Sequence, residues 1–63
     1  MNPTPRRIRV LVVDDSELVR SGLRTLLGAY SDIEVIGETD SAAGALREVQ
    51  ALRPDLVLLD LRL

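Results

Sequence analysis

The apolar residues of the chain fall into two continuous runs, with a shorter and more mixed run between them. Residues 8–13 are apolar except for Arg9, and residues 55–60 read Asp-Leu-Val-Leu-Leu-Asp. A run without alternation is typical of a strand covered on both faces, as in parallel sheets. Residues 33–38 form a third candidate strand, and their lower apolar content favours the edge of a sheet. Three strands are therefore predicted, and Arg9 is expected to reach water near the start of the first.

Two segments with helical periodicity separate the three candidate strands. Apolar residues recur at helical spacing over residues 16–27 and again over residues 41–53. Ser16 and Ser41 stand at the start of these segments, and serine is a typical N-cap residue. Pro54 ends the second helix, because the residue before a proline resists helical geometry. The predicted order of elements is therefore β-α-β-α-β.

This order of elements predicts an α/β fold. Short connections and right-handed crossovers make the strands parallel, so we expect a three-stranded parallel sheet with two helices packed on it. The strand order that we expect is 2-1-3. Residues 1–7 contain two prolines and predict a flexible N-terminal arm, whereas residues 8–63 form one domain. Gly22 and Gly44 lie inside the predicted helices, where glycine costs about 1 kcal/mol against alanine, and close helix–sheet packing explains them.

The composition excludes several classes of function. The sequence has no Lys, His or Cys, which excludes disulfides, thiolate metal sites, His- or Cys-based triads and a lysine phosphate loop. A net charge of -2 and a single aromatic residue, Tyr30, argue against direct nucleic-acid binding by this segment. The longest apolar runs are too short to span a membrane, and no export signal is present, so a cytoplasmic protein is expected.

Three aspartates follow the apolar strands. Asp14 and Asp15 end the first strand, and Asp60 ends the third. In a parallel sheet these ends lie on one edge, and neighbouring first and third strands would make the three side chains converge there. Converging carboxylates repel one another, and Mg²⁺, which prefers oxygen ligands, removes that conflict. Such a site can hold a phosphoryl group, and a carboxylate can itself accept one as an acyl phosphate.

Structural explanations compete with this chemistry. An aspartate after a strand often caps the next helix or begins a turn, which is as good an explanation for Asp15 alone and the better one for Asp60 alone. An enzyme or nucleotide binder of flavodoxin-like or Rossmann type is a weaker alternative, because no G-x-G-x-x-G follows the first strand. Arg20 and Arg24 are interpreted as solvated positions on the first helix.

Several motifs resemble the receiver domain of bacterial two-component response regulators. Residues 10–16, Val-Leu-Val-Val-Asp-Asp-Ser, resemble its opening, and residues 54–63 resemble the segment around its phospho-acceptor. Arg20 matches an arginine often found in the first helix of the family. Residues 35–38, Val-Ile-Gly-Glu, are most similar to the NarL/FixJ type, whose members usually carry a C-terminal helix-turn-helix module. The resemblance covers residues 8–63.

The resemblance implies a role for each matching residue. Asp60 would be the aspartate that a partner histidine kinase phosphorylates. Asp14, Asp15 and Asp60 would hold Mg²⁺, directly or through water, and the backbone carbonyl of Arg62 would be a further ligand. The chain would then act in phosphorelay signalling rather than as an enzyme, and its full-length parent would be a DNA-binding transcriptional regulator.

The chain also departs from the family pattern. A complete receiver is a five-stranded, flavodoxin-like domain of about twice this length, and its switch Ser or Thr and its Lys have no counterpart in residues 8–63. We therefore expect a partial receiver fold with weak Mg²⁺ binding and impaired phosphorylation and switching. Strand 55–60 would expose an apolar edge, which favours a homo-oligomer. The alternative is a self-associating half-receiver that serves only as an assembly module.

Overall fold

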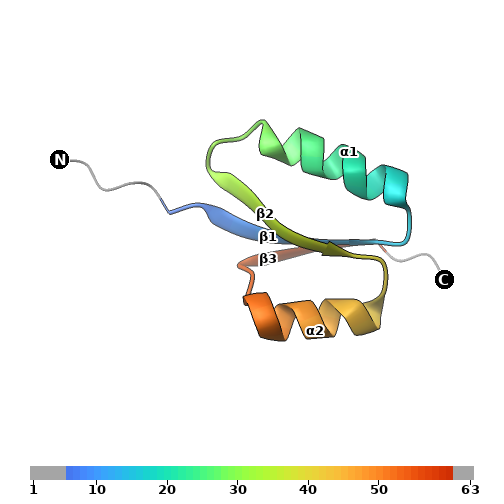
Figure 1. Cartoon of the computed structure of the whole chain (residues 1–63). Coiled ribbons are helices and arrows are strands. Elements are labelled where there is room, and N and C mark those ends of the chain that lie inside the picture. Colours follow the sequence, from blue (N-terminus) through green and yellow to red (C-terminus); the bar gives the residue numbers. More distant parts are fainter. Residues whose placement is uncertain (1–5, 61–63) are drawn as a thin grey trace.

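The structure, a computed structural model, describes residues 6–60 of the chain. Its elements follow one another in the predicted order (Figure 1). They are β1 (Ile8–Asp14), α1 (Glu17–Gly28), β2 (Ile33–Thr39), α2 (Ala42–Leu52) and β3 (Leu56–Asp60). Most of the predicted N-terminal arm, residues 1–5, lies outside the described residues, so the division into arm and domain stays a prediction.

The three strands form one parallel sheet in the order β2-β1-β3, which confirms the predicted fold and strand order. Helix α1 lies over one face of the sheet and α2 over the other (Figure 1). Both helices pack mainly over β1 and β2. Strand β2 is an outer strand, as its mixed composition predicts, and β3 is the other outer strand.

The apolar core is centred on β1. Val10, Leu11, Val12 and Val13 are each no more than 1% exposed, because strands flank β1 on both sides and helices cover both faces. Burial of such side chains stabilises a fold by about 1.5–3 kcal/mol each. The outer strand β3 is equally apolar, yet its side chains are largely exposed within the described residues.

Two glycines lie where helix α2 comes close to the sheet. A Cβ at Gly44 would lie 2.1 Å from Thr39 Oγ1, so only glycine allows the first turn of α2 to contact the end of β2. A Cβ at Gly37 would lie 2.9 Å from Leu52 Cδ1 at the other end of the same helix. Close packing therefore explains Gly44 as predicted, whereas the interpretation is wrong for Gly22, which has open space around it.

The helix starts match the predicted caps. The Ser16 hydroxyl accepts a hydrogen bond from Val19 N at 3.3 Å, and the Ser41 hydroxyl accepts one from Gly44 N at 3.0 Å. Each bond satisfies a backbone donor that has no partner within the helix. Ser16 therefore sets the start of α1 after β1, and Ser41 sets the start of α2 after β2.

A polar cluster ties the start of β1 to the connection between α2 and β3. The Asp55 carboxylate accepts hydrogen bonds from Arg9 N at 2.9 Å and from the Arg6 guanidinium at 2.8 Å. Arg9 is partly exposed, in line with its position near the start of the strand. Its guanidinium also donates to the carbonyls of Arg53 at 2.8 Å and Leu52 at 2.7 Å. Those carbonyls end a helix, where a cation is favourable.

This cluster predicts a pH dependence of stability. The Arg9 backbone N–H, and to a lesser extent the Arg6 charge, hold the pKa of the Asp55 carboxyl below its usual range. A lowered folded-state pKa stabilises the fold above the unfolded pKa, and this stabilisation is lost as the pH falls through the folded value. The stability advantage of the wild type over Asp55→Asn should therefore be present at neutral pH, decline below about pH 4, and vanish only once the pH is below the folded-state pKa of Asp55.

Urea unfolding of both proteins across this pH range measures the effect. Asp32→Asn is a suitable control, since Asp32 is exposed and its carboxylate makes no polar contact within residues 6–60. A difference between wild type and Asp55→Asn that stays constant with pH would contradict the role given to this carboxylate.

Candidate functional site

The ends of β1 and β3 lie side by side at the carboxyl edge of the sheet. Asp14 and Asp60 are direct register partners in the β1–β3 ladder. Asp14 is only 3% exposed, whereas Asp60 is exposed. Two acidic positions separated by more than forty residues therefore meet at one edge, as the strand order requires.

The Asp14 carboxylate is buried and only half satisfied. Its Oδ1 accepts a hydrogen bond from Ser16 N at 2.8 Å, which shapes the turn from β1 into α1. Its Oδ2 is buried and has no hydrogen-bond partner among the described residues. A buried carboxylate oxygen without a partner is costly, so it indicates a place for a cation or a donor.

Asp14 and Asp60 share a hollow between α1 and β3. It has a volume of about 210 Å³, and its other walls are apolar side chains from the three elements that meet there: Val13, Leu23, Leu58 and Leu59. A larger hollow of about 440 Å³ runs along the outer edge of β2, away from these two carboxylates. The smaller hollow is the one lined by two of the predicted site residues, Asp14 and Asp60.

Asp15 does not join this pair in the structure. It lies in the bend after β1 and is exposed, because consecutive residues at a strand end point in different directions. Within residues 6–60 no group of three or more acidic side chains is close enough to hold a metal ion. The predicted convergence of all three side chains is therefore not seen, and Arg62 lies outside the described residues.

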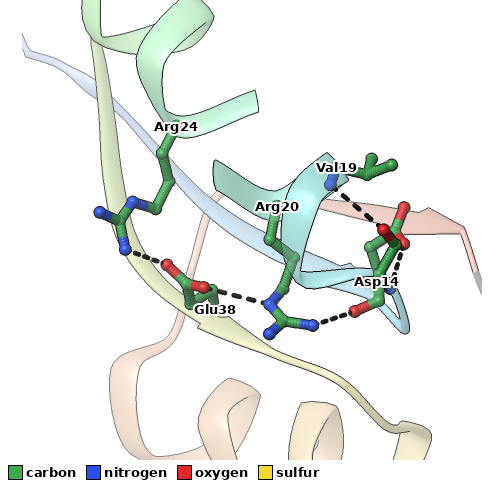
Figure 2. A network of polar contacts seen from close by, with 6 residues as sticks. Asp14, Val19, Arg20, Arg24 and Glu38 are labelled. Carbon is green, nitrogen blue, oxygen red and sulfur yellow. Dashed lines mark hydrogen bonds and ion pairs between the residues drawn. The ribbon is translucent and has the colours of Figure 1, made fainter. Parts of the chain in front are cut away.

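A network of two arginines and one glutamate supports the end of β1. Arg20 Nη1 donates to the Asp14 carbonyl oxygen at 2.6 Å, and Arg20 Nε donates to Glu38 Oε1 at 3.1 Å (Figure 2). Arg24 binds the other Glu38 oxygen. Hydrogen bonds from Arg24 and Arg20 hold the pKa of the Glu38 carboxyl below its usual range. The interpretation as a solvated position is wrong for Arg20, whose side chain is only 14% exposed, but it holds for Arg24, which is exposed. Glu38, which binds both arginines, is not singled out by the sequence pattern.

The Asp14 and Asp60 carboxylates suit a hard divalent cation. Mg²⁺ takes oxygen ligands, keeps several waters and needs only one or two protein carboxylates. The unpartnered Asp14 Oδ2 is an oxygen of this kind, already desolvated at the right edge of the sheet. The described residues therefore fit the ion through these two side chains.

Comparison with known proteins agrees with this geometry. The family model of the response regulator receiver domain matches residues 10–63. The chain belongs to this family. The resemblance drawn from the sequence motifs is thereby confirmed, and the receiver domain is a signalling domain of two-component systems.

Curated relatives of this receiver segment are regulators from several bacteria. The DNA-binding transcriptional activator DevR/DosR of Mycobacterium tuberculosis is 50% identical over 56 residues, which cover 89% of the chain. The response regulator GacA of Pseudomonas viridiflava is 43% identical over 56 residues, again 89% of the chain. The response regulator protein VraR of Staphylococcus aureus is 50% identical over 54 residues, or 86% of the chain.

The receiver segment is short beside these relatives. It spans about a quarter of their length, 26% in each of the three. No solved structure matches the chain. Within residues 6–60, neither helix is long and apolar enough to cross a membrane.

The half-satisfied carboxylate predicts an unusual effect on stability. Asp14→Asn keeps an oxygen to accept from Ser16 N and removes a buried charge, so we expect it to raise the free energy of unfolding by about 1 kcal/mol in the absence of divalent cations. Urea denaturation in the presence of a chelator measures this difference.

Asp15→Asn is the matched control, because Asp15 is the adjacent acidic residue and is exposed. Its effect should stay within about 0.5 kcal/mol. A loss of stability in Asp14→Asn would mean that the buried carboxylate is satisfied in a way that the geometry does not include.

Proposed function

We propose that this chain supplies the phospho-acceptor edge of a receiver domain, in which Asp60 takes a phosphoryl group from a partner histidine kinase. The observation that carries the proposal is the register pairing of exposed Asp60 with buried Asp14, whose Oδ2 has no partner within the described residues. One carboxylate is accessible for reaction, and the other is held ready for a cation.

The proposed reaction is a phosphoryl transfer between two side chains. The bond from phosphorus to the imidazole nitrogen of the kinase breaks, and a bond from phosphorus to a carboxylate oxygen of Asp60 forms. The imidazole nitrogen keeps the electron pair and takes up a proton. Mg²⁺, when bound, neutralises the negative charge that gathers where the carboxylates meet the phosphoryl group.

Each acidic residue has a separate part in this proposal. Asp14 would offer Oδ2 to the cation, and Asp15, from the bend after β1, would help to hold it directly or through water. The carbonyl of Arg62 is a proposed further ligand. The ion should bind weakly, because the described residues provide only two carboxylates that share one hollow.

The parent protein that we propose is a cytoplasmic DNA-binding transcriptional regulator. One relative is named a DNA-binding transcriptional activator, which supports this assignment. The segment itself carries a net charge of -2 and is not expected to contact nucleic acid. It contains no lysine to contact the phosphoryl group, so we propose that these 63 residues alone are impaired in phosphorylation and switching.

Mass spectrometry of the intact chain tests the proposed acceptor. Incubation with acetyl phosphate and Mg²⁺ should give slow, substoichiometric addition of one phosphoryl group, because no lysine assists the transfer. The addition should disappear in Asp60→Asn and in the presence of a chelator.

The outcomes separate the two parts of the proposal. Equal incorporation in Asp60→Asn and in the wild type would overturn the assignment of the acceptor. Rapid, complete and Asp60-dependent incorporation would overturn only the impairment.

A second candidate function, an assembly module, is favoured by the surface of β3. Leu56, Val57 and Leu59 are 47%, 37% and 64% exposed. One edge of β3 has no strand partner within residues 6–60, and an apolar edge of this kind invites pairing with another chain. We propose that the chain forms a homo-oligomer through strand 55–60.

Light-scattering chromatography over a range of concentrations tests this association. The wild type should elute as a dimer or larger species, whereas Leu59→Lys should be monomeric, since a charge on an edge strand opposes pairing. Leu46→Lys is the control, because Leu46 is 67% exposed on α2 and should leave association unchanged. A single monomer peak of the wild type at high concentration would exclude the assembly function.

A further inference from the structure

Arg20 is a nearly buried cation that joins three elements of the fold. It belongs to the first turns of α1, and its side chain is only 14% exposed. One arm of its guanidinium reaches the Asp14 carbonyl at the end of β1, and another reaches Glu38 on β2 (Figure 2). The planar, forked guanidinium is suited to hold two acceptors in a fixed relation.

The contact to Asp14 is made with the backbone and not with the carboxylate. Arg20 Nη1 lies 2.6 Å from the Asp14 carbonyl oxygen, whereas Asp14 Oδ1 is used by Ser16 N and Oδ2 has no partner among the described residues. A guanidinium on the carboxylate itself would occupy the oxygens that a metal ion needs. Here the arginine fixes the backbone of Asp14 and leaves Oδ2 without a partner among the described residues.

The backbone of Asp14 is paired with a neighbouring strand on one side only, so a contact from the other side adds support. The β1–β3 ladder extends to the pair Asp14 and Asp60, but the β1–β2 ladder ends one residue earlier, at Val13 and Thr39. Arg20 bridges this gap, since its second contact is on Glu38 of β2. The path from β2 through Arg20 to the Asp14 carbonyl replaces the missing ladder contact.

We propose that Arg20 is a positioning residue of the acidic site, and that Glu38 holds it in place. By fixing the Asp14 carbonyl, Arg20 sets the position of the Asp14 carboxylate at the shared hollow. The part of this inference that concerns Mg²⁺ rests on the proposed function. Removal of an outer partner of a metal ligand typically weakens metal affinity by 10–100-fold, which sets the expected effect.

Arg24 provides a matched control on the same helix. It binds the same Glu38 carboxylate, is 57% exposed, and makes no contact with Asp14 within residues 6–60. Loss of Arg24 therefore removes a similar charge and ion pair without touching the Asp14 carbonyl. A role of Arg20 that is limited to the ion pair with Glu38 would make the two arginines equivalent.

The test compares wild type, Arg20→Met, Arg20→Lys and Arg24→Met by NMR. The metal-free proteins are examined first, through the carbonyl ¹³C shift of Asp14 and the hydrogen exchange of the Ser16 amide. Mg²⁺ is then titrated, and its affinity is taken from the shifts at Asp14 and Asp60. Urea unfolding of each variant separates changes in affinity from loss of folded protein.

Arg20→Met should move the Asp14 carbonyl shift, speed exchange of the Ser16 amide and weaken Mg²⁺ binding by roughly tenfold. Arg24→Met should leave both metal-free signals in place and change the affinity by less than about twofold. Arg20→Lys keeps the charge but not the fork, so it should move the same signals to a smaller extent. If Arg20→Met does not fold, the same measurements on Arg20→Lys decide the test.

Equal effects of the Arg20 and Arg24 variants would overturn the inference, as would unchanged Asp14 and Ser16 signals in both Arg20 variants. A wild type that shows no response to Mg²⁺ would count against the proposed metal site alone. The metal-free comparison would still decide whether Arg20 positions Asp14.

Discussion

The burial of β1 is the constraint on which the rest of the structure depends. Four consecutive apolar side chains are removed from water only because β1 lies between β2 and β3 and between α1 and α2. The same placement carries Asp14 into the interior at the end of the strand. The buried carboxylate is therefore a consequence of the apolar strand that precedes it, and its position beside Asp60 follows from the parallel ladder.

Both ends of β1 are held by an arginine that binds backbone carbonyls. Arg9 donates to the last carbonyls of α2 at one end, and Arg20 donates to the carbonyl of Asp14 at the other. A carboxylate accompanies each arginine, Asp55 at the Arg9 backbone and Glu38 at the Arg20 side chain. Each arginine thus has an acidic side chain beside it, and neither of them is paired with the carboxylate of Asp14.

The regular elements could be predicted from periodicity because their signals are local. The predicted strands and helices agree with the structure to within about one residue at each end, which is within the usual uncertainty of element boundaries. The start of the third strand differs from the prediction for an identifiable reason. Asp55 was placed in the third strand, but it precedes β3 and binds Arg9 and Arg6 instead.

The errors at the site come from contacts between residues far apart in the sequence. Nothing near Arg20 in the chain reveals that its partner is Glu38, eighteen positions away on another strand. The spacing of Arg20 and Arg24, one helical turn apart, with a glutamate in the following strand was the available signal. The exposure of Asp15 was likewise hidden, because a pair of adjacent aspartates does not show which one turns inward.

The two outer strands differ in a way that limits how copies of this chain can associate. The ladder between β1 and β2 shifts register between Val10 and Leu11, so Ile36 forms a bulge, and bulges blunt the edge of a sheet. The ladder between β1 and β3 has no such shift. Within residues 6–60, each copy then offers one regular free edge, and the proposed two-fold pairing of β3 with β3 would use both edges and close as a dimer rather than a filament. Two-fold symmetry would run the paired strands antiparallel, so the two Asp14–Asp60 edges would lie at opposite ends of the joined sheet.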